Sequence, residues 1–207
     1  MKIDAFVLIG GKSSRFGTDK ATIIFDEKSL AERTATTIQK ALSPVRITFV
    51  AANKNQPAAQ ITSGLGFKVM YDTDENRGPL GAVCTALAHA QTEWALVLAC
   101  DLPFISVELL QRLAGFVSDE TDAVTPMQSD GKMQSLCSLY RTKPCAAAMR
   151  NLLETDQSTP IRQVFENVQT RFVAFDELND LPNASNFFLN VNTPEDFQTA
   201  TAILASK

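Results

Sequence analysis

The sequence of 207 residues predicts an α/β protein with three layers, in which helices cover both faces of a mostly parallel central sheet. Short, continuous apolar runs bounded by polar turns indicate strands that are buried on both faces. These runs alternate with segments of helical pattern, which is typical of consecutive βαβ units. The composition, 45% hydrophobic and 20% charged, suits one sizeable core. Because no repeat, low-complexity tract or linker divides the chain, we expect one domain over residues 1–207.

The first half is the more regular part of the pattern. The expected strands are Ala5–Ile9, Val45–Ala52, Phe67–Tyr71 and Trp94–Cys100. The expected helices are Ser29–Leu42, Pro79–Ala90 and Ser106–Phe116. Ser29 and Ser106 favour helix starts at these positions, because a serine side chain can accept a hydrogen bond from an unpaired backbone amide of the first turn.

The second half continues the alternation with shorter elements. Strands are expected at Ala123–Pro126, Leu136–Tyr140 and Thr170–Phe175, and helices at Pro144–Leu153, at Pro160–Val168 and from Pro194 onward. Proline at the first position of a helix is favourable because its missing amide hydrogen would have no partner there.

Charge and hydropathy exclude several classes of protein. The net charge is −4 and no basic tract is present, so no surface for wrapping nucleic acid is expected. No apolar run approaches the roughly 20 residues of a membrane span. The first expected strand begins almost at once, which leaves no room for a signal peptide, and we expect a cytoplasmic protein.

Metal-thiolate and hydrolase chemistry are also disfavoured. The four cysteines are far apart in the sequence and none forms a Cys-x-x-Cys pair, so a zinc site is not expected. The single histidine, His89, lies in an alanine-rich helical stretch and is interpreted as structural.

A glycine-rich loop leaves the end of the first strand. The segment Leu8–Lys20 contains Gly10, Gly11 and Gly17 with the cations Lys12, Arg15 and Lys20. Glycines let backbone amides converge on anionic oxygens, and the cations supply charge, so the loop is typical of a phosphate site. It matches neither the Walker A nor the dinucleotide-binding pattern. The alternative is a solvated turn.

Carboxylates follow two of the expected strands. Asp101 ends the strand at Cys100, and Asp72 ends the strand at Tyr71. Ligands of open α/β sheets bind outside the carboxyl ends of the strands, where Gly10 also lies. A carboxylate that faces phosphates needs a divalent cation between them, which makes Asp101 a candidate Mg²⁺ ligand, or else a turn residue before Pro103. Asp72 lines a base or ribose pocket, or belongs to a solvated loop.

Two amides precede the last expected helix. Asn192 or Thr193 can cap the helix that begins at Pro194, which has acidic residues in its first turn. Capping does not explain Asn190, which lies on the same side of an extended chain as Asn192. Two such amides could hydrogen-bond a polar ligand or hold a metal-bound water.

Taken together, these segments resemble the molybdenum cofactor guanylyltransferase (MobA) family of the Rossmann-like nucleotidyltransferases. The resemblance is carried by the loop Leu8–Lys20, Asp72, Gly78-Pro79-Leu80, Cys100-Asp101-Leu102-Pro103-Phe104 and Asn190-Val191-Asn192-Thr193-Pro194-Glu195. It implies the three-layer nucleotidyltransferase fold and transfer of GMP from Mg²⁺-bound GTP to the terminal phosphate of molybdopterin, with release of pyrophosphate. It also implies enzymes that deliver molybdopterin and accept the product as partners.

The resemblance also implies roles for individual residues. Leu8, Ile9 and Gly10 would contact the nucleotide through their backbone, Arg15 and Lys20 would hold the phosphates, and Asp101 would bind Mg²⁺. Asp72 would contact GTP, Gly78-Pro79-Leu80 would border the guanine, and Asn190 and Asn192 would serve the molybdopterin side or the metal. A nucleotide-contacting asparagine of the family aligns with Ala51, and Asn53 is the nearest amide.

The residues leave other functions open. A molybdopterin cytidylyltransferase, or a nucleotidyltransferase for a sugar phosphate or another phosphorylated metabolite, would use the same loop and aspartate. A nucleotide-binding or cofactor-chaperoning module without catalysis is an alternative from another class. A purely structural domain would leave the clustered Lys12, Arg15 and Lys20 unexplained.

Overall fold

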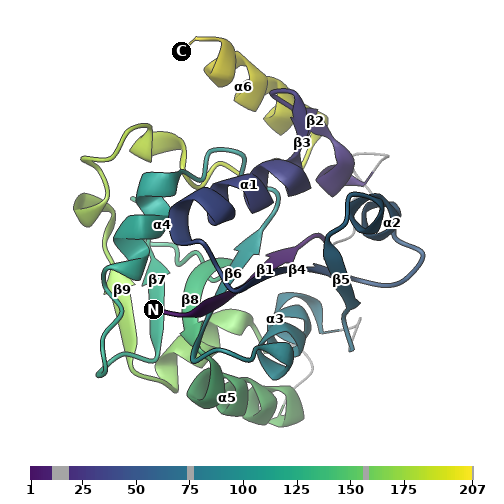
Figure 1. Cartoon of the computed structure of the whole chain (residues 1–207). Helices are drawn as coiled ribbons and strands as arrows, with labels where there is room; N and C mark the ends of the chain where they lie inside the picture. Colours follow the sequence, from purple (N-terminus) through teal and green to yellow (C-terminus); the bar gives the residue numbers. More distant parts are fainter. Residues whose placement is uncertain (11–18, 74–76, 156–158, 207) are drawn as a thin grey trace.

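The computed structural model describes residues 1–10, 19–73, 77–155 and 159–206, and in them a seven-stranded sheet forms the centre of the molecule (Figure 1). Its strand order is β5-β4-β1-β6-β8-β7-β9. The strands are β1 (Ile3–Leu8), β4 (Arg46–Ala51), β5 (Lys68–Tyr71), β6 (Trp94–Ala99), β7 (Ala123–Pro126), β8 (Cys137–Arg141) and β9 (Thr170–Val173). Only β8 runs antiparallel to its neighbours, so the expected mostly parallel sheet is confirmed.

Helices cover both faces of this sheet, which gives the expected three layers (Figure 1). On one face lie α1 (Leu30–Leu42) and α4 (Val107–Ala114), and on the other α3 (Gly78–His89) and α5 (Thr142–Thr155). Strand β1 serves both cores, because its successive side chains point to opposite faces. Ile3, Ala5 and Val7 are buried toward α1 and α4, whereas Phe6 and Leu8 are buried toward α3 and α5.

Several helices begin where the sequence indicated. The Ser29 side chain accepts from the Glu32 amide at 3.2 Å, and the Glu32 carboxylate accepts from the Ser29 amide at 3.0 Å, a reciprocal capping box. Ser106 caps α4 through the Leu109 amide at 3.1 Å. Thr193 caps α6 (Pro194–Ala205) in the same way, with Asp196 as its partner.

A short hairpin and a short helix were not expected from the sequence. The strands β2 (Ile24–Phe25) and β3 (Lys28–Ser29) have two residues each and show no usable periodicity. Asp26 and Glu27 join them with positive φ angles of 54° and 68°, as a two-residue hairpin turn requires. The helix α2 (Pro57–Gly64) is also too short for a clear pattern, and its first residue is proline.

Two expected helices of the second half differ in detail. The segment Ile161–Glu166 (η2) forms a 3₁₀ helix after Pro160 and not an α-helix over Pro160–Val168. The helix α5 begins at Thr142, so Pro144 is its third residue and not its first. Pro144 is tolerated in the first turn of α5 because the amides there have no helical acceptor.

The C-terminal helix packs on the hairpin near the top of the molecule (Figure 1). Phe25 of β2, Leu30, Phe104, Val191 and Ala200 of α6 form a separate buried cluster. The rings of Phe25 and Phe104 meet edge to face, with centroids 5.8 Å apart. This cluster fixes the segment before α6 against the turn that follows β6.

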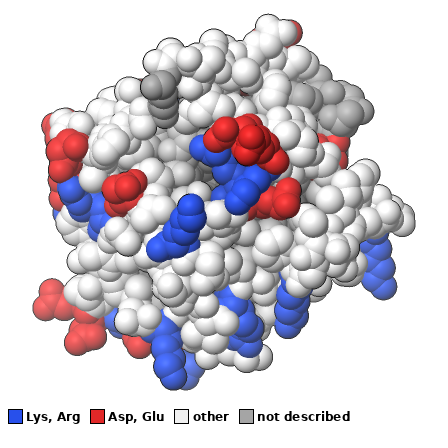
Figure 2. Space-filling model, turned by 45° about the horizontal axis from the view of Figure 1, so that its top comes forward, with Lys and Arg blue, Asp and Glu red and all other residues white. Residues whose placement is uncertain are grey.

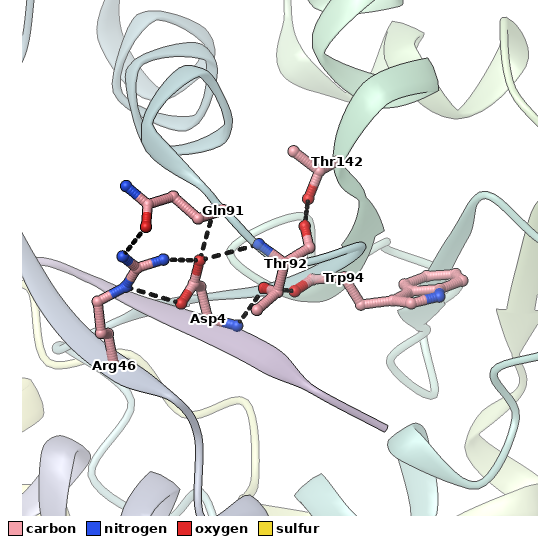
Figure 3. A network of polar contacts seen from close by, with 6 residues as sticks. All are labelled: Asp4, Arg46, Gln91, Thr92, Trp94 and Thr142. Carbon is pink, nitrogen blue, oxygen red and sulfur yellow. Dashed lines mark hydrogen bonds and ion pairs between the residues drawn. The ribbon is translucent and has the colours of Figure 1, made fainter.

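A buried polar network lies at the amino ends of the central strands (Figure 3). The Asp4 carboxylate, 1% exposed, accepts from Arg46 Nη2 at 2.7 Å and Nε at 3.1 Å, and from the amides of Gln91 and Thr92 at 2.7 and 3.2 Å. Thr142 donates to the Thr92 carbonyl oxygen at 2.8 Å. Burial alone would raise the pKa of Asp4, but the bonds from Arg46 and Gln91 hold it below its ordinary value.

No helix of the described residues is long and apolar enough to cross a membrane.

Candidate active site

The candidate site lies at the carboxyl ends of β1 and β6. From β1 the chain builds β4 and β5 on one side and then crosses to β6 on the other, so the strand order reverses at β1. Such a reversal opens a crevice in which α/β proteins bind ligands. Pairing of the two strands extends to the crevice, because the Cys100 amide donates to the Leu8 carbonyl oxygen at 3.1 Å.

A cavity of about 720 Å³ occupies this crevice. The six residues that the sequence assigned to GTP all line it: Leu8, Ile9, Gly10, Lys20, Asp72 and Asp101. Gly78 and Pro79 also line it, whereas Leu80, a residue of α3, is buried in the core between that helix and the sheet. The fold thus brings together residues from four separate segments, and their roles in binding remain predictions.

Lys20 and Asp101 form an ion pair at the cavity. Lys20 belongs to the short 3₁₀ helix η1 (Lys20–Thr22), and its Nζ lies 3.0 Å from Asp101 Oδ2 and 2.8 Å from Asn192 Oδ1. The side chains of Lys20 and Asp101 are 16% and 21% exposed. The Val191 amide donates to the Asp101 carbonyl oxygen at 2.9 Å, which anchors the segment that carries Asn192. A cation and a carboxylate therefore stand side by side where a ligand can reach both.

Asp19 orients this part of the chain, a role that sequence reasoning missed. Its Oδ1 accepts from the Ala21 amide at 3.2 Å and caps η1, while its Oδ2 accepts from the Ala58 amide of α2 at 3.0 Å. One carboxylate thereby joins the Lys20 segment to the opposite wall of the cavity. An Asp immediately before a short helix is a capping signal, but its second partner is distant in the sequence.

Asp72 is oriented by a buried threonine. Its amide donates to the Ala51 carbonyl oxygen at 2.8 Å, and its Oδ1 accepts from Thr85 Oγ1 of α3 at 3.0 Å. Thr85 is 4% exposed and also accepts from the Thr73 amide at 3.2 Å. Asp72 is therefore part of an ordered network at the cavity and not a solvated loop residue.

The two amides before α6 have different surroundings. Asn192 contacts Lys20, as described above, and so belongs to the ion-pair cluster. Asn190 Nδ2 donates to the Phe188 carbonyl oxygen at 3.4 Å, and Asn190 does not line the cavity. Arg15, together with Gly11 and Lys12, lies outside the described residues.

The β4 side of the cavity lacks the asparagine that the family resemblance implies. Ala51 stands at that position, is buried and has no polar side-chain group. Asn53 and Gln56 line the cavity nearby, and Gln56 is a residue that sequence reasoning did not single out.

The donors at the cavity suit a divalent cation that arrives with phosphate oxygens. Among the described residues, no group of three or more His, Cys, Asp or Glu side chains is placed to hold a metal ion. Asp72 and Asp101 are the carboxylates that the described part of the chain contributes to the cavity lining. Mg²⁺ is commonly held by one or two carboxylates, with substrate phosphates and water completing its coordination. The residues present fit that arrangement, with Asp101 as the carboxylate beside Lys20.

The cysteine at the site is not a nucleophile. Cys100 lines the cavity wall but is buried, and burial raises the pKa of its thiol far above the ordinary value. The other cysteines are free thiols, and burial raises the pKa of Cys137 and Cys145 to about 12. No covalent step through a thiolate is indicated.

The charges on the face seen in Figure 2 are mixed. Lys and Arg side chains lie beside Asp and Glu side chains there, and they do not merge into one continuous basic patch.

A crevice at the strand-order reversal holds a lysine paired with an aspartate beside the glycine that follows β1, which is where an α/β protein of this topology binds a ligand. Residues 5–171 match the family described as MobA-like NTP transferase domain, and the chain belongs to this family. It is 31% identical over 209 residues to a molybdenum cofactor guanylyltransferase of Shewanella halifaxensis, covering 100% of this chain and 97% of the relative.

Two further relatives agree with this assignment. A probable molybdenum cofactor guanylyltransferase of Halalkalibacterium halodurans is 32% identical over 202 residues, which cover 94% of this chain and 96% of the relative. The crystal structure of molybdopterin-guanine dinucleotide biosynthesis protein A from Archaeoglobus fulgidus superimposes with a TM-score of 0.76 at 24% identity, covering 99% of this chain and 100% of that chain. The latter likeness shows that the fold is shared.

Proposed function

We propose that this protein transfers GMP from GTP to the terminal phosphate of molybdopterin, releasing pyrophosphate and forming molybdopterin guanine dinucleotide. The observation that carries the proposal is the contact of Lys20 with Asp101 and Asn192 at the nucleotide-sized cavity of a MobA-like NTP transferase. The names of the relatives supply the substrates.

The roles of the residues follow from their places around the cavity. The backbone of Leu8, Ile9 and Gly10 contacts the nucleotide, and Asp72 contacts GTP from the opposite side. Gly78 and Pro79 border the guanine. Lys20 neutralises the phosphates, and Arg15 is assigned the same role from the family resemblance alone.

The reaction is an in-line displacement that requires little covalent chemistry from the protein. A terminal phosphate oxygen of molybdopterin forms a bond to the α-phosphorus of GTP, and the bond from that phosphorus to the leaving pyrophosphate breaks. The attacking phosphate is already ionised at neutral pH, so no general base is required. Lys20 and Arg15 act by positioning the triphosphate and by stabilising the negative charge that develops on it.

Asp101 is the residue that would hold Mg²⁺. The bound ion would neutralise part of the negative charge of the triphosphate. Without the ion, the carboxylate of Asp101 would repel the triphosphate. Asn192 contacts Lys20, and we assign it to the metal-bound water or to the molybdopterin side. Asn190 is assigned to the molybdopterin side from the family resemblance alone, and neither asparagine is among the residues that line the cavity.

We also propose that residues 1–207 act as one nucleotidyltransferase domain. The family match ends at residue 171, but the later segment supplies Val191, which bonds Asp101, and Asn192, which bonds Lys20. Enzymes that deliver molybdopterin or accept the product are the expected protein partners.

The test combines the purified protein with molybdopterin, Mg²⁺ and either GTP or CTP, and measures pyrophosphate and the dinucleotide product. Pyrophosphate release with GTP and little with CTP is expected. Release with CTP in preference to GTP would assign a cytidylyltransferase. Tight GTP binding in calorimetry without pyrophosphate release would instead assign a binding module.

A further inference from the structure

The regular backbone ladder between β1 and β4 ends at the wall of the cavity. The two strands pair in parallel as far as Leu8 opposite Val50, and the Ile9 amide donates to the Val50 carbonyl oxygen at 2.9 Å. In a regular parallel ladder, the next bond would run from the Ala52 amide to the Ile9 carbonyl oxygen.

The Gln56 side chain takes the place of that bond. Its Oε1 accepts from the Ala52 amide at 2.8 Å, and its Nε2 donates to the Ile9 carbonyl oxygen. A single carboxamide thus satisfies both backbone groups that the ladder would have joined, and it lies between the two strand ends as a spacer.

The spacer shapes one wall of the cavity. Ile9, Gly10, Ala52 and Gln56 all line the cavity at this point. Next to the carboxamide, the backbones of Gly10 and Ala52 lie close together. A Cβ atom added at Gly10 would lie 2.9 Å from the Ala52 nitrogen. Gly10 and the carboxamide of Gln56 together set the distance between the ends of β1 and β4 at this wall.

The backbone of Gln56 is itself held in place. Gln56 immediately precedes α2, and its amide donates to the Asn53 carbonyl oxygen at 3.3 Å. The first turn of α2 is tied to the Lys20 segment through the bond from the Ala58 amide to Asp19 at 3.0 Å. The carboxamide is therefore presented from a segment anchored to the opposite side of the site.

We propose that Gln56 is a positioning residue for the nucleotide: its carboxamide replaces the last β1–β4 rung and holds the Ile9–Gly10 backbone where the nucleotide contacts it. The inference rests on the proposed function, because the nucleotide is the ligand of this wall. Without the carboxamide, the Ala52 amide and the Ile9 carbonyl oxygen lose the partner that holds them at this spacing, and the Ile9–Gly10 backbone can shift relative to β4. The wall then no longer fits the nucleotide.

The test compares Gln56→Met with Gln60→Met. Methionine keeps the length and approximate shape of glutamine but makes neither hydrogen bond, and Gln60 is an exposed residue of α2, the helix that Gln56 precedes. In calorimetry with Mg²⁺ and GTP, Gln56→Met is expected to bind GTP about tenfold more weakly, as the loss of one to two neutral hydrogen bonds predicts, and Gln60→Met within about twofold of wild type. The KM for GTP should rise while kcat stays within about twofold.

Two further measurements separate positioning from general stability. In Gln56→Met, the amide resonance of Ala52 should shift while the melting temperature falls by only a few degrees. If Gln56→Met does not fold, Gln56→Glu tests the same contact, since a carboxylate still accepts from the Ala52 amide but cannot donate to Ile9. It too should bind GTP about tenfold more weakly.

The outcomes distinguish this inference from the proposed function. A wild-type protein that binds no GTP overturns the proposed function and the inference with it. A wild-type protein that binds GTP, with a foldable Gln56 variant that binds it equally well, overturns the inference alone. An unshifted Ala52 resonance in Gln56→Met also overturns it.

Discussion

Lys20 Nζ lies 3.0 Å from Asp101 Oδ2, although 81 positions separate the two residues in the sequence. Asn192, 172 positions from Lys20, completes the contact at 2.8 Å. The end of the glycine-rich loop, the end of β6 and the segment before α6 therefore meet at one point. The pair places a cation and a carboxylate together at the wall of the cavity.

Removal of the Asp101 carboxylate tests the metal assignment. Asp101→Asn is expected to reduce pyrophosphate release about 10²- to 10³-fold or more with the fold intact, because the group that holds the cation against the triphosphate is lost. The rate is measured with GTP, molybdopterin and Mg²⁺, and circular dichroism checks the fold. Asp180→Asn, which alters an exposed pair with Arg112, is the control and should retain the wild-type rate. Wild-type turnover in Asp101→Asn would refute the assignment.

Neutralisation of Lys20 tests the phosphate contact. Lys20→Met removes the cation from the ion pair and leaves the carboxylate of Asp101 facing the triphosphate. Catalytic efficiency with GTP should fall about 10²-fold, and GTP binding should depend less steeply on salt. Lys68→Met, at the exposed start of β5 on the opposite edge of the sheet, should change neither. Equal salt dependence in wild type and Lys20→Met would argue against a phosphate contact.

An added methyl group at Gly10 tests the close approach to β4. In Gly10→Ala the new Cβ would lie 2.9 Å from the backbone nitrogen of Ala52, so one of the two strand ends must move. The free energy of unfolding should fall by about 1–3 kcal/mol, and GTP affinity should fall with it. Gly64→Ala is the matched control, since nothing lies within 4 Å of its added Cβ, and urea titration should show unchanged or slightly higher stability. Similar losses in both variants would contradict a specific clash.

The buried Asp4 carboxylate predicts a pH-dependent stability difference. Its pKa is lowered in the folded protein, so its contribution is present above the unfolded value of about 4 and is lost as the pH falls through the folded value. Asp4→Asn should lower the free energy of unfolding by about 2–3 kcal/mol at pH 7, because Arg46 loses its carboxylate partner. The difference from wild type should shrink below about pH 4.

The control for this measurement is Asp26→Asn. Asp26 pairs with Arg33 at the surface and is 50% exposed, and such pairs contribute about 0–1 kcal/mol. Asparagine also tolerates the left-handed conformation of this turn residue. If the free energy of unfolding of Asp4→Asn differs from that of wild type by the same amount from pH 7 to pH 3, the charge of Asp4 does not stabilise the fold.

Some elements of the fold were predictable because their signals are local. The strands β1, β4 and β6 lie in mostly apolar runs, and Ser29, Ser106 and Thr193 cap helices through amides three residues away. By contrast, β2, β3 and α2 are too short to show a period, and β2 and β3 are held by contacts with Phe104 and α6 from the far end of the chain.

For the site, the sequence indicated which residues meet at one cavity, and their chemical roles stay predictions. Gly10, Asp72 and Asp101 could be identified because each follows an expected strand, and parallel strands bring their carboxyl ends to one edge. The partners of these residues became visible only in the folded structure. That Lys20 pairs with Asp101 and Asn192, that Thr85 orients Asp72, and that Gln56 replaces a rung of the sheet all depend on contacts between distant segments. Such contacts are set by how helices and strands pack, and they cannot be inferred from the residues that are adjacent in the sequence.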